Sequence, residues 1–330
     1  QGVSSAASDV YKRQPLFTAP MDTVVDLTNI DQFLSNGIKV TLPRTVNLKD
    51  FYSQYDVRYN QVFIGLGLND INNYLIGGMD IFRQNAHILI DVANGHMTQI
   101  VEYCKEIKLK RPDIVIMVGN IANPETYKIY AKNNCVDFIR VGIGNGGGCL
   151  TTKQSGVGFP MASLIHETYK VKQELKEKGK IDNLPKIVAD GGMKDYSDIV
   201  KALALGADYV MVGSIFNKSL ESSAKNYFWG IKVCDKTATW LFDHGFTIKK
   251  YFRGMSTKGA QKSMGKTNFK TSEGVTRFRK VEYHIEGWVQ NFTHYLRNAM
   301  SYAGSSKLID FIGKVNIIQI TSRSYDRFNK

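Results

Sequence analysis

Eight short runs rich in apolar, β-branched residues recur between residues 15 and 214, and they limit the possible folds more than any other feature. Several are apolar nearly throughout, as strands buried on both faces of a parallel sheet must be. The runs are 15–20, 38–43, 62–67, 87–93, 114–120, 136–142, 186–192 and 209–214. Helix-like stretches separate them, among them 96–110, 123–134 and 197–206. The alternation predicts an α/β protein, a (β/α)8 TIM barrel, with a doubly wound sheet as the alternative.

The segments outside this pattern predict the domain boundaries. Residues 1–14 do not join naturally to the first run, and we interpret them as a non-native leader. Residues 15–330 are expected to form one barrel domain, because a single α/β barrel often reaches this length. Residues 235–285 are rich in Lys, Gly, Thr and Ser without strong core periodicity, which predicts a long excursion carrying a mobile flap. An amphipathic helix over 288–304 is expected to close the chain.

Composition and charge exclude several classes of protein. No apolar run approaches the roughly 18 residues of a membrane helix, and no signal-peptide pattern is present, so a soluble, cytoplasmic protein without membrane partners is expected. The four cysteines have no C-x-x-C spacing, which argues against a disulfide framework or structural zinc. The net charge of +13 comes from dispersed basic residues, with much of the excess after residue 245. It indicates a solvated basic surface or a field that attracts small phosphorylated substrates, rather than nucleic-acid binding.

Polar or glycine-rich residues follow each predicted strand, at the barrel face where active sites lie. They include Asp22, Arg44, Asp91, Asn94, Asn120, the 142–149 loop, Asp190 to Gly192, Gly213 and Ser214. Glycine-rich loops after the seventh and eighth strands expose backbone N–H groups that bind phosphate well. Gly191, Gly192, Gly213 and Ser214 therefore predict a phosphate site. Asp190 beside them could accept hydrogen bonds from ribose hydroxyls.

Cys149 lies in the stretch "VGIGNGGGCLTTKQSGVGFP", which has glycines at 144, 146, 147 and 148 just before it. Such a backbone turns tightly and can present the thiol exposed and deprotonated, as a nucleophile requires. Cys104 on a helix and Cys135 before a strand are expected to be inert buried residues.

These residues resemble the IMP dehydrogenase and GMP reductase family over about residues 15–310. "GIGNGGGCLTTKQSGVG" is similar to the family's catalytic cysteine loop, and "ADGGMKDYSDIVKALALGADYVMVGS" follows its pattern throughout. "APMDTV" resembles the first barrel strand, while "DVANGH" and "VGN" resemble cofactor-side loops. "RGMS" resembles the purine-contacting loop and "SEG" the flap carboxylate.

The resemblance implies a covalent mechanism on a purine nucleotide monophosphate, in which Cys149 attacks C2 and hydride moves between C2 and a nicotinamide. Thr151 and Glu273 would transfer protons at the C2 substituent. The implied substrate-binding residues are Asp190, Gly191, Gly192, Gly213, Ser214, Gly254, Met255, Ser256, Ser272 and Gly274. The implied cofactor-binding residues are Arg44, Asp91, Val92, Ala93, Asn120, Ile143 and Gly144. Gly144, Gly146 and Cys149 would surround a monovalent cation, typically potassium, and the family is usually tetrameric.

The resemblance leaves two reactions open, and we favour the reductase. A GMP reductase would use NADPH to convert GMP to IMP and ammonia, whereas an IMP dehydrogenase would oxidise IMP to XMP with NAD. The dehydrogenases use an Arg-Tyr pair in a longer flap, and "TKGAQKSMGKTNFKTS" (257–272) contains neither residue. "APMDTV" is nearer to the dehydrogenases. A nucleotide-binding protein without turnover and a basic RNA-binding protein are further alternatives.

The chain departs from the family pattern at several positions. Gly147 stands where serine is common, which removes a phosphate contact, and Arg44 stands where lysine is usual. Thr152 replaces a basic or amide residue beside the cation loop. Tyr251 is shifted by one position from the family tyrosine and is not assigned a role.

Overall fold

The computed structural model describes residues 14–56, 59, 61–78, 81–179, 183–264 and 274–328. All eight predicted runs form strands. They pair in parallel in the order β1-β8-β7-β6-β5-β4-β3-β2. A parallel bridge between Phe17 and Lys39 joins the two ends of this sheet, and the Thr18 N–H donates to the Lys39 carbonyl at 2.9 Å. The (β/α)8 barrel is therefore confirmed, and the doubly wound alternative is wrong.

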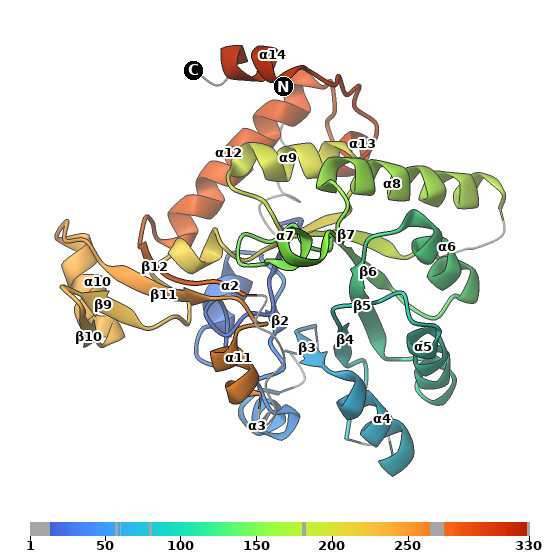
Figure 1. Cartoon of the computed structure of the whole chain (residues 1–330), viewed down its shortest axis with the longest axis horizontal. Coiled ribbons are helices and arrows are strands. Elements are labelled where there is room, and N and C mark those ends of the chain that lie inside the picture. The colour runs from blue at the N-terminus through green and yellow to red at the C-terminus, as the bar shows by residue number, and fades with distance from the viewer. Residues whose placement is uncertain are drawn as a thin grey trace.

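Most strands are shorter than the apolar runs that predicted them, because the ends of those runs belong to the loops, whereas β5 is as long as its run. Their bounds are β1 Leu16–Thr18, β2 Thr41–Leu42, β3 Phe63–Leu66, β4 His87–Asp91, β5 Val115–Ile121, β6 Phe138–Val141, β7 Lys186–Asp190 and β8 Tyr209–Val212. The helices that follow them surround the barrel, except for the short α7, which lies in the middle of the view over the strands (Figure 1). They are α2 Ile30–Ser35, α3 Leu48–Gln54, α4 Leu68–Gly77, α5 Thr98–Lys110, α6 Pro124–Asn133, α7 Thr151–Ser155, α8 Met161–Glu177 and α9 Tyr196–Ala204.

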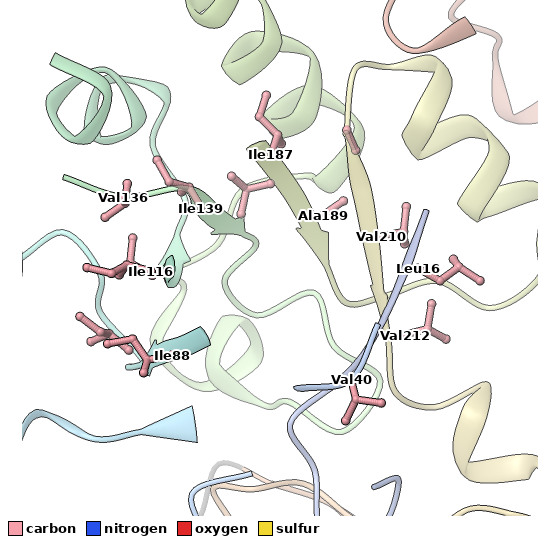
Figure 2. Close-up of a cluster of buried hydrophobic side chains, with 14 of the residues drawn as sticks. Leu16, Val40, Ile88, Ile116, Val136, Ile139, Ile187, Ala189, Val210 and Val212 are labelled. Carbon is pink, nitrogen blue, oxygen red and sulfur yellow. The ribbon is translucent and has the colours of Figure 1, made fainter. Parts of the chain in front are cut away.

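Side chains alternate between the inside of the barrel and the layer under the helices, as the strand period of two requires. Phe17, Phe63, Phe138 and Tyr209 fill the interior, with edge-on ring contacts such as Phe17–Phe63 at 5.5 Å between centroids. The neighbouring positions point outward into an aliphatic layer, where Leu16 and Val210 lie near Val40 and Val212 (Figure 2). The barrel is thus a filled scaffold, and chemistry is left to the loops at its carboxyl end.

A second sheet, with strand order β10-β9-β11-β12, lies beside the barrel (Figure 1). Its elements are β9 Asn226–Phe228, β10 Ile231–Val233, α10 Asp235–Asp243, β11 Lys249–Arg253, α11 Lys258–Ser263 and β12 Thr276–Lys280. A small core that includes Leu220, Leu241 and Ile248 stabilises it. The sequence of 235–285 shows no strong core periodicity, and the segment nevertheless contributes to this folded sheet. Strands of three to five residues are too short to show a clear period.

Helix α12 (Ile285–Tyr302) begins before the predicted start and takes the place of the eighth barrel helix. Trp288 stacks on Tyr196 of α9 at 5.1 Å and meets Phe216 edge-on at 5.3 Å. Phe216 lies in the 3-10 turn η2 (Phe216–Lys218) after β8. The helix does not close the chain, because α13 (Leu308–Phe311) and α14 (Ser322–Phe328) follow.

The other boundary predictions are less constrained. Residues 1–13 lie outside the described part of the chain, so the non-native leader stays a prediction. The assignment of residues 15–330 to a single domain also stays a prediction. Across the described ranges, none of the helices combines the length and apolarity needed to cross a bilayer.

Candidate active site

The cysteine loop leaves β6 and passes over the carboxyl end of the barrel to α7. Cys149 is partly buried, and its Sγ–H donates to the Thr151 hydroxyl at 3.2 Å. Its backbone N–H donates to the Gly146 carbonyl at 2.9 Å. Cys149 also forms an antiparallel bridge with Gly274, at the point where the described chain resumes after the flap. The thiol, the threonine hydroxyl and the end of the flap thus meet in one place.

Glycines allow the loops after β6 and β7 to touch, and two positions show this directly. Gly142 has a φ of 138°, and a Cβ there would lie 2.3 Å from the Asp190 carbonyl oxygen. Gly192 has a φ of 89°, and its Cβ would lie 2.7 Å from the Asn145 carbonyl. A side chain at either position would therefore separate the cysteine loop from the predicted ribose residue.

Arg140 of β6 joins the two predicted carboxylates and was missed by the sequence reasoning. Its guanidinium donates to Asp91 at 2.8 Å and to Asp190 Oδ2 at 2.6 and 3.2 Å. Burial alone would lower the pKa of Arg140, but Asp190 and Asp91 outweigh burial and raise the pKa. The sequence did contain an indication of this role, because Arg140 is the one charged residue in the otherwise apolar run 138–141.

Two more predicted residues extend this network toward the cofactor side. Asn120 donates to Asp190 Oδ2 at 2.7 Å and to the Gly142 carbonyl at 2.6 Å. Arg44, which follows β2, pairs with Asp91 at 3.1 Å. Val92 exchanges backbone hydrogen bonds with the segment at Gly119 and Asn120. The structure therefore brings Arg44, Asp91, Asn120 and Asp190 together.

A cavity of about 610 Å³ opens beside this network. Ala93 and Ile143, both predicted cofactor residues, line it together with Thr151, so the cavity reaches the partner of the thiol. His96 also lines it. The Ala122 N–H donates to His96 Nε2 at 3.1 Å, so the proton lies on Nδ1, 2.6 Å from the Thr126 hydroxyl. Burial lowers the pKa of His96, which favours the neutral ring.

The predicted base-contacting residues lie where β11 ends. The Gly254 N–H donates to the Val275 carbonyl, and the Val275 N–H donates to the Gly148 carbonyl, each at 3.1 Å. Met255 and Ser256 follow in the turn before α11. This segment is therefore tied to the cysteine loop through the strand that leads away from the flap.

Gly213 and Ser214 lie after β8, beside the first barrel strand. A Cβ at Gly213 would lie 3.0 Å from Met21 Sδ, and the Ser214 carbonyl accepts a hydrogen bond from Arg279. Gly191 reaches the same region, because its Cβ position is 3.2 Å from Gly146 Cα. The predicted phosphate loop after β7 thus borders the cysteine loop, and Arg279 joins the loop after β8 to strand β12.

The predicted flap residues and the predicted cation site remain to be placed. Glu273 and Ser272 lie outside the described residues. In the cation loop, the Gly146 carbonyl accepts the Cys149 N–H, and each carbonyl oxygen has a second lone pair for a ligand. A Cβ at Gly144 would collide with the Thr152 hydroxyl, which donates to Val157. The described residues hold no cluster of three or more His, Cys, Asp or Glu side chains, and potassium would rely on carbonyl oxygens instead.

Comparisons with known proteins identify the family of this chain. The model of the IMP dehydrogenase / GMP reductase domain matches residues 82–327. An inosine-5'-monophosphate dehydrogenase of Cryptosporidium parvum is 32% identical over 274 residues, covering 79% of this chain and 61% of that protein. GMP reductase 1 of Homo sapiens is 26% identical over 324 residues, covering 96% of this chain and 87% of its own length. A GMP reductase of Caenorhabditis elegans is 26% identical over 326 residues, with coverage of 96% and 84%.

The family model covers most of the chain, and the matched segment includes the cysteine loop and the loops after β4 to β8. The GMP reductases align with nearly the whole chain, whereas the chain spans less than two thirds of the dehydrogenase. The chain therefore belongs to the IMP dehydrogenase / GMP reductase family of oxidoreductases.

Proposed function

We propose that this chain is a GMP reductase, which converts GMP to IMP and ammonia with NADPH. The observation that carries the proposal is the contact of 3.2 Å between Cys149 and Thr151, next to the bridge from Cys149 to Gly274. In the proposed reaction Cys149 would be the nucleophile and Thr151 would take part in proton transfer, and their contact supports these two roles. The alignment of GMP reductases along 96% of the chain supports the same reaction.

Asp190 is suited to hold the ribose. Its Oδ2 accepts from Arg140 and Asn120, so the carboxylate is fixed in orientation and Oδ1 is left for hydroxyl donors. The backbone N–H groups at Gly191, Gly192, Gly213 and Ser214 would face the phosphate. Met255 and Ser256, held beside the cysteine loop, would contact the purine.

In the proposed reaction the Cys149 thiolate forms a bond to C2 of GMP. The 2-amino group leaves as ammonia after accepting a proton, which Thr151 and Glu273 would deliver. The product of this step is a covalent thioimidate. When C2 gains hydride, the C–S bond breaks and its electron pair returns to Cys149 as the thiolate, which releases IMP. The sum consumes GMP, NADPH and two protons and yields IMP, ammonium and NADP⁺.

The cavity beside Thr151 has a volume of about 610 Å³, within the usual range of ligand pockets, and would receive the nicotinamide end of NADPH. NADPH bound there would supply the hydride. Ala93 and Ile143 would line the ring's site, and the Arg44–Asp91 pair would lie at its edge. Potassium at the carbonyls of Gly144 and Gly146 would order the cysteine loop. The homotetramer and the cytoplasmic location stay predictions.

IMP dehydrogenase is the second candidate, since the dehydrogenase relative is 32% identical, compared with 26% for the reductases. The dehydrogenase reaction needs a group that activates water. The segment from Thr257 to Ser272 has neither the arginine nor the tyrosine that the resemblance implies for this task. That difference favours the reductase.

A two-sided assay with potassium present distinguishes the candidates. GMP with NADPH is expected to yield IMP and ammonia, and Cys149→Ala is expected to abolish the reaction while GMP still binds. Cys234→Ala is the matched control, because Cys234 is exposed and lies outside the barrel, between β10 and α10. XMP formed from IMP and NAD would establish the dehydrogenase instead. Nucleotide binding without turnover in either direction would indicate a silent binding protein.

A further inference from the structure

Two arginines of β12 lie together beside the cysteine loop. Arg277 and Arg279 are two residues apart on one strand, so their side chains point to the same face of the sheet. Both guanidinium groups lie over the ring of Phe252, at 5.4 and 4.2 Å from its centroid. Phe252 is only 1% exposed and belongs to the neighbouring strand β11. The ring therefore gives both cations a fixed, apolar support.

Each arginine reaches one of the loops that surround the predicted phosphate position. Arg277 Nη2 donates to the Gly147 carbonyl at 2.9 Å, and Arg279 Nη1 donates to the Ser214 carbonyl at 3.0 Å. A Cβ built on Gly147 would lie 3.6 Å from Arg277 Nη2 and 4.0 Å from Arg279 Nη2. The two guanidinium groups therefore border the space into which a side chain at residue 147 would project.

Within the described part of the chain no carboxylate touches this pair, although the more distant charge of Glu282 acts on Arg279 and opposes the lowering of its pKa. Neither Arg277 nor Arg279 forms an ion pair with a described carboxylate. Arg279 is half-buried, and burial together with the charge of Arg277 lowers the pKa of Arg279 to about 10. A guanidinium has five N–H donors, and few of them are used here. The pair is thus preorganised for an anion.

We propose that Arg277 and Arg279 bind the 5′-phosphate of the purine nucleotide and replace the contact that Gly147 cannot make. This inference rests on the proposed function, which supplies the nucleotide. A phosphate monoester carries close to two negative charges, which two guanidinium groups match. The Ser214 carbonyl holds Arg279 next to the backbone N–H groups of the β8 loop, so both kinds of donor can reach one phosphate.

The test compares GMP with guanosine, which lacks the phosphate, by calorimetric titration. The variants are Arg277→Gln and Arg279→Gln, and the matched control is Lys280→Gln. Lys280 lies on the same strand but on the opposite face, opposite Lys249 of β11. Each arginine variant is expected to bind GMP about ten- to a hundredfold more weakly, with guanosine affinity unchanged. The control is expected to keep both affinities, and thermal unfolding checks that each variant folds.

The outcomes separate this inference from the proposed function. The titrations measure binding without turnover. They therefore test the role of the two arginines even if the protein binds GMP and does not reduce it. Equal weakening of GMP and guanosine, or no weakening, would overturn the phosphate assignment even in an active reductase. It would also be overturned if the wild-type protein bound GMP no better than guanosine. An equal loss in Lys280→Gln would indicate a diffuse field, as polynucleotide binding requires, instead of a phosphate site.

Discussion

Replacing Arg140 with methionine removes the charge that joins Asp91 to Asp190. The side chain of Arg140 is 7% exposed, and those of the two aspartates are 17% and 14% exposed. Removing one partner of a buried ion pair costs about 3–5 kcal/mol, because the remaining charge stays desolvated. Asp91 keeps Arg44 at 3.1 Å and Asp190 keeps Asn120 at 2.7 Å. We therefore expect Arg140→Met to lower the free energy of unfolding by about 3 kcal/mol, the lower end of that range.

Equilibrium unfolding in urea, followed by tryptophan fluorescence, measures this loss. Arg140→Lys keeps the charge but cannot reach both carboxylates with a planar fork, so about half the loss is expected. Lys105→Met is the surface control. Lys105 pairs with Glu102 at 2.9 Å, but both side chains are exposed, and such a pair is worth at most about 0.5 kcal/mol. A loss under about 1 kcal/mol in Arg140→Met would refute the reasoning, as would equal losses in the lysine and methionine variants.

Three further predictions concern the flap, the loop contact and a histidine. Glu273→Gln is expected to slow ammonia release by about a hundredfold or more in single-turnover assays, and an unchanged rate would remove Glu273 from the mechanism. Gly142→Ala, with its Cβ 2.3 Å from the Asp190 carbonyl, should cost about 3 kcal/mol in urea unfolding. Gly156 also has a positive φ, of 71°, but a Cβ there would meet open space, so Gly156→Ala should cost about 1 kcal/mol; equal costs would contradict the collision. Burial would lower the pKa of His284, but Asp243 and Glu221 raise it. Its stabilisation is thus full below the unfolded pKa of about 6.5 and is lost as pH rises through the folded pKa. His284→Gln should make the urea midpoint depend less on pH over that range. If the pH dependence of the midpoint is unchanged in the variant, His284 is not its source.

The barrel could be predicted because its signal is local. A strand buried on both faces is apolar at successive positions, as in β8 with Val210 and Val212 outward and Met211 inward. The small sheet could not be predicted in this way. Strand β12 exposes most of its residues, and its pairing with β11 joins segments separated by the flap. Only a tertiary contact shows that these residues form a strand.

The residues of the site also divide into those that the local sequence predicts and those that only the fold brings together. Cys149 and Thr151 are close in the chain, so their contact follows from the loop sequence. Arg140 acts through carboxylates on β4 and β7, and no spacing in the sequence shows that these strand ends meet around it. Arg277 and Arg279 look like part of a basic, solvated segment until Phe252 and the Gly147 carbonyl are placed beside them.

The nucleophile loop is supported from two sides, which explains why a barrel enzyme would keep the small sheet. On the barrel side, Gly191 and Gly192 let the β7 loop press against the loop at Gly146. On the sheet side, the Gly148 carbonyl accepts the Val275 N–H, and Cys149 pairs with Gly274. The backbone that carries the predicted nucleophile is therefore held both by the barrel loops and by the small sheet. Covalent catalysis needs a nucleophile in a defined position, and these two sets of contacts supply the support for it.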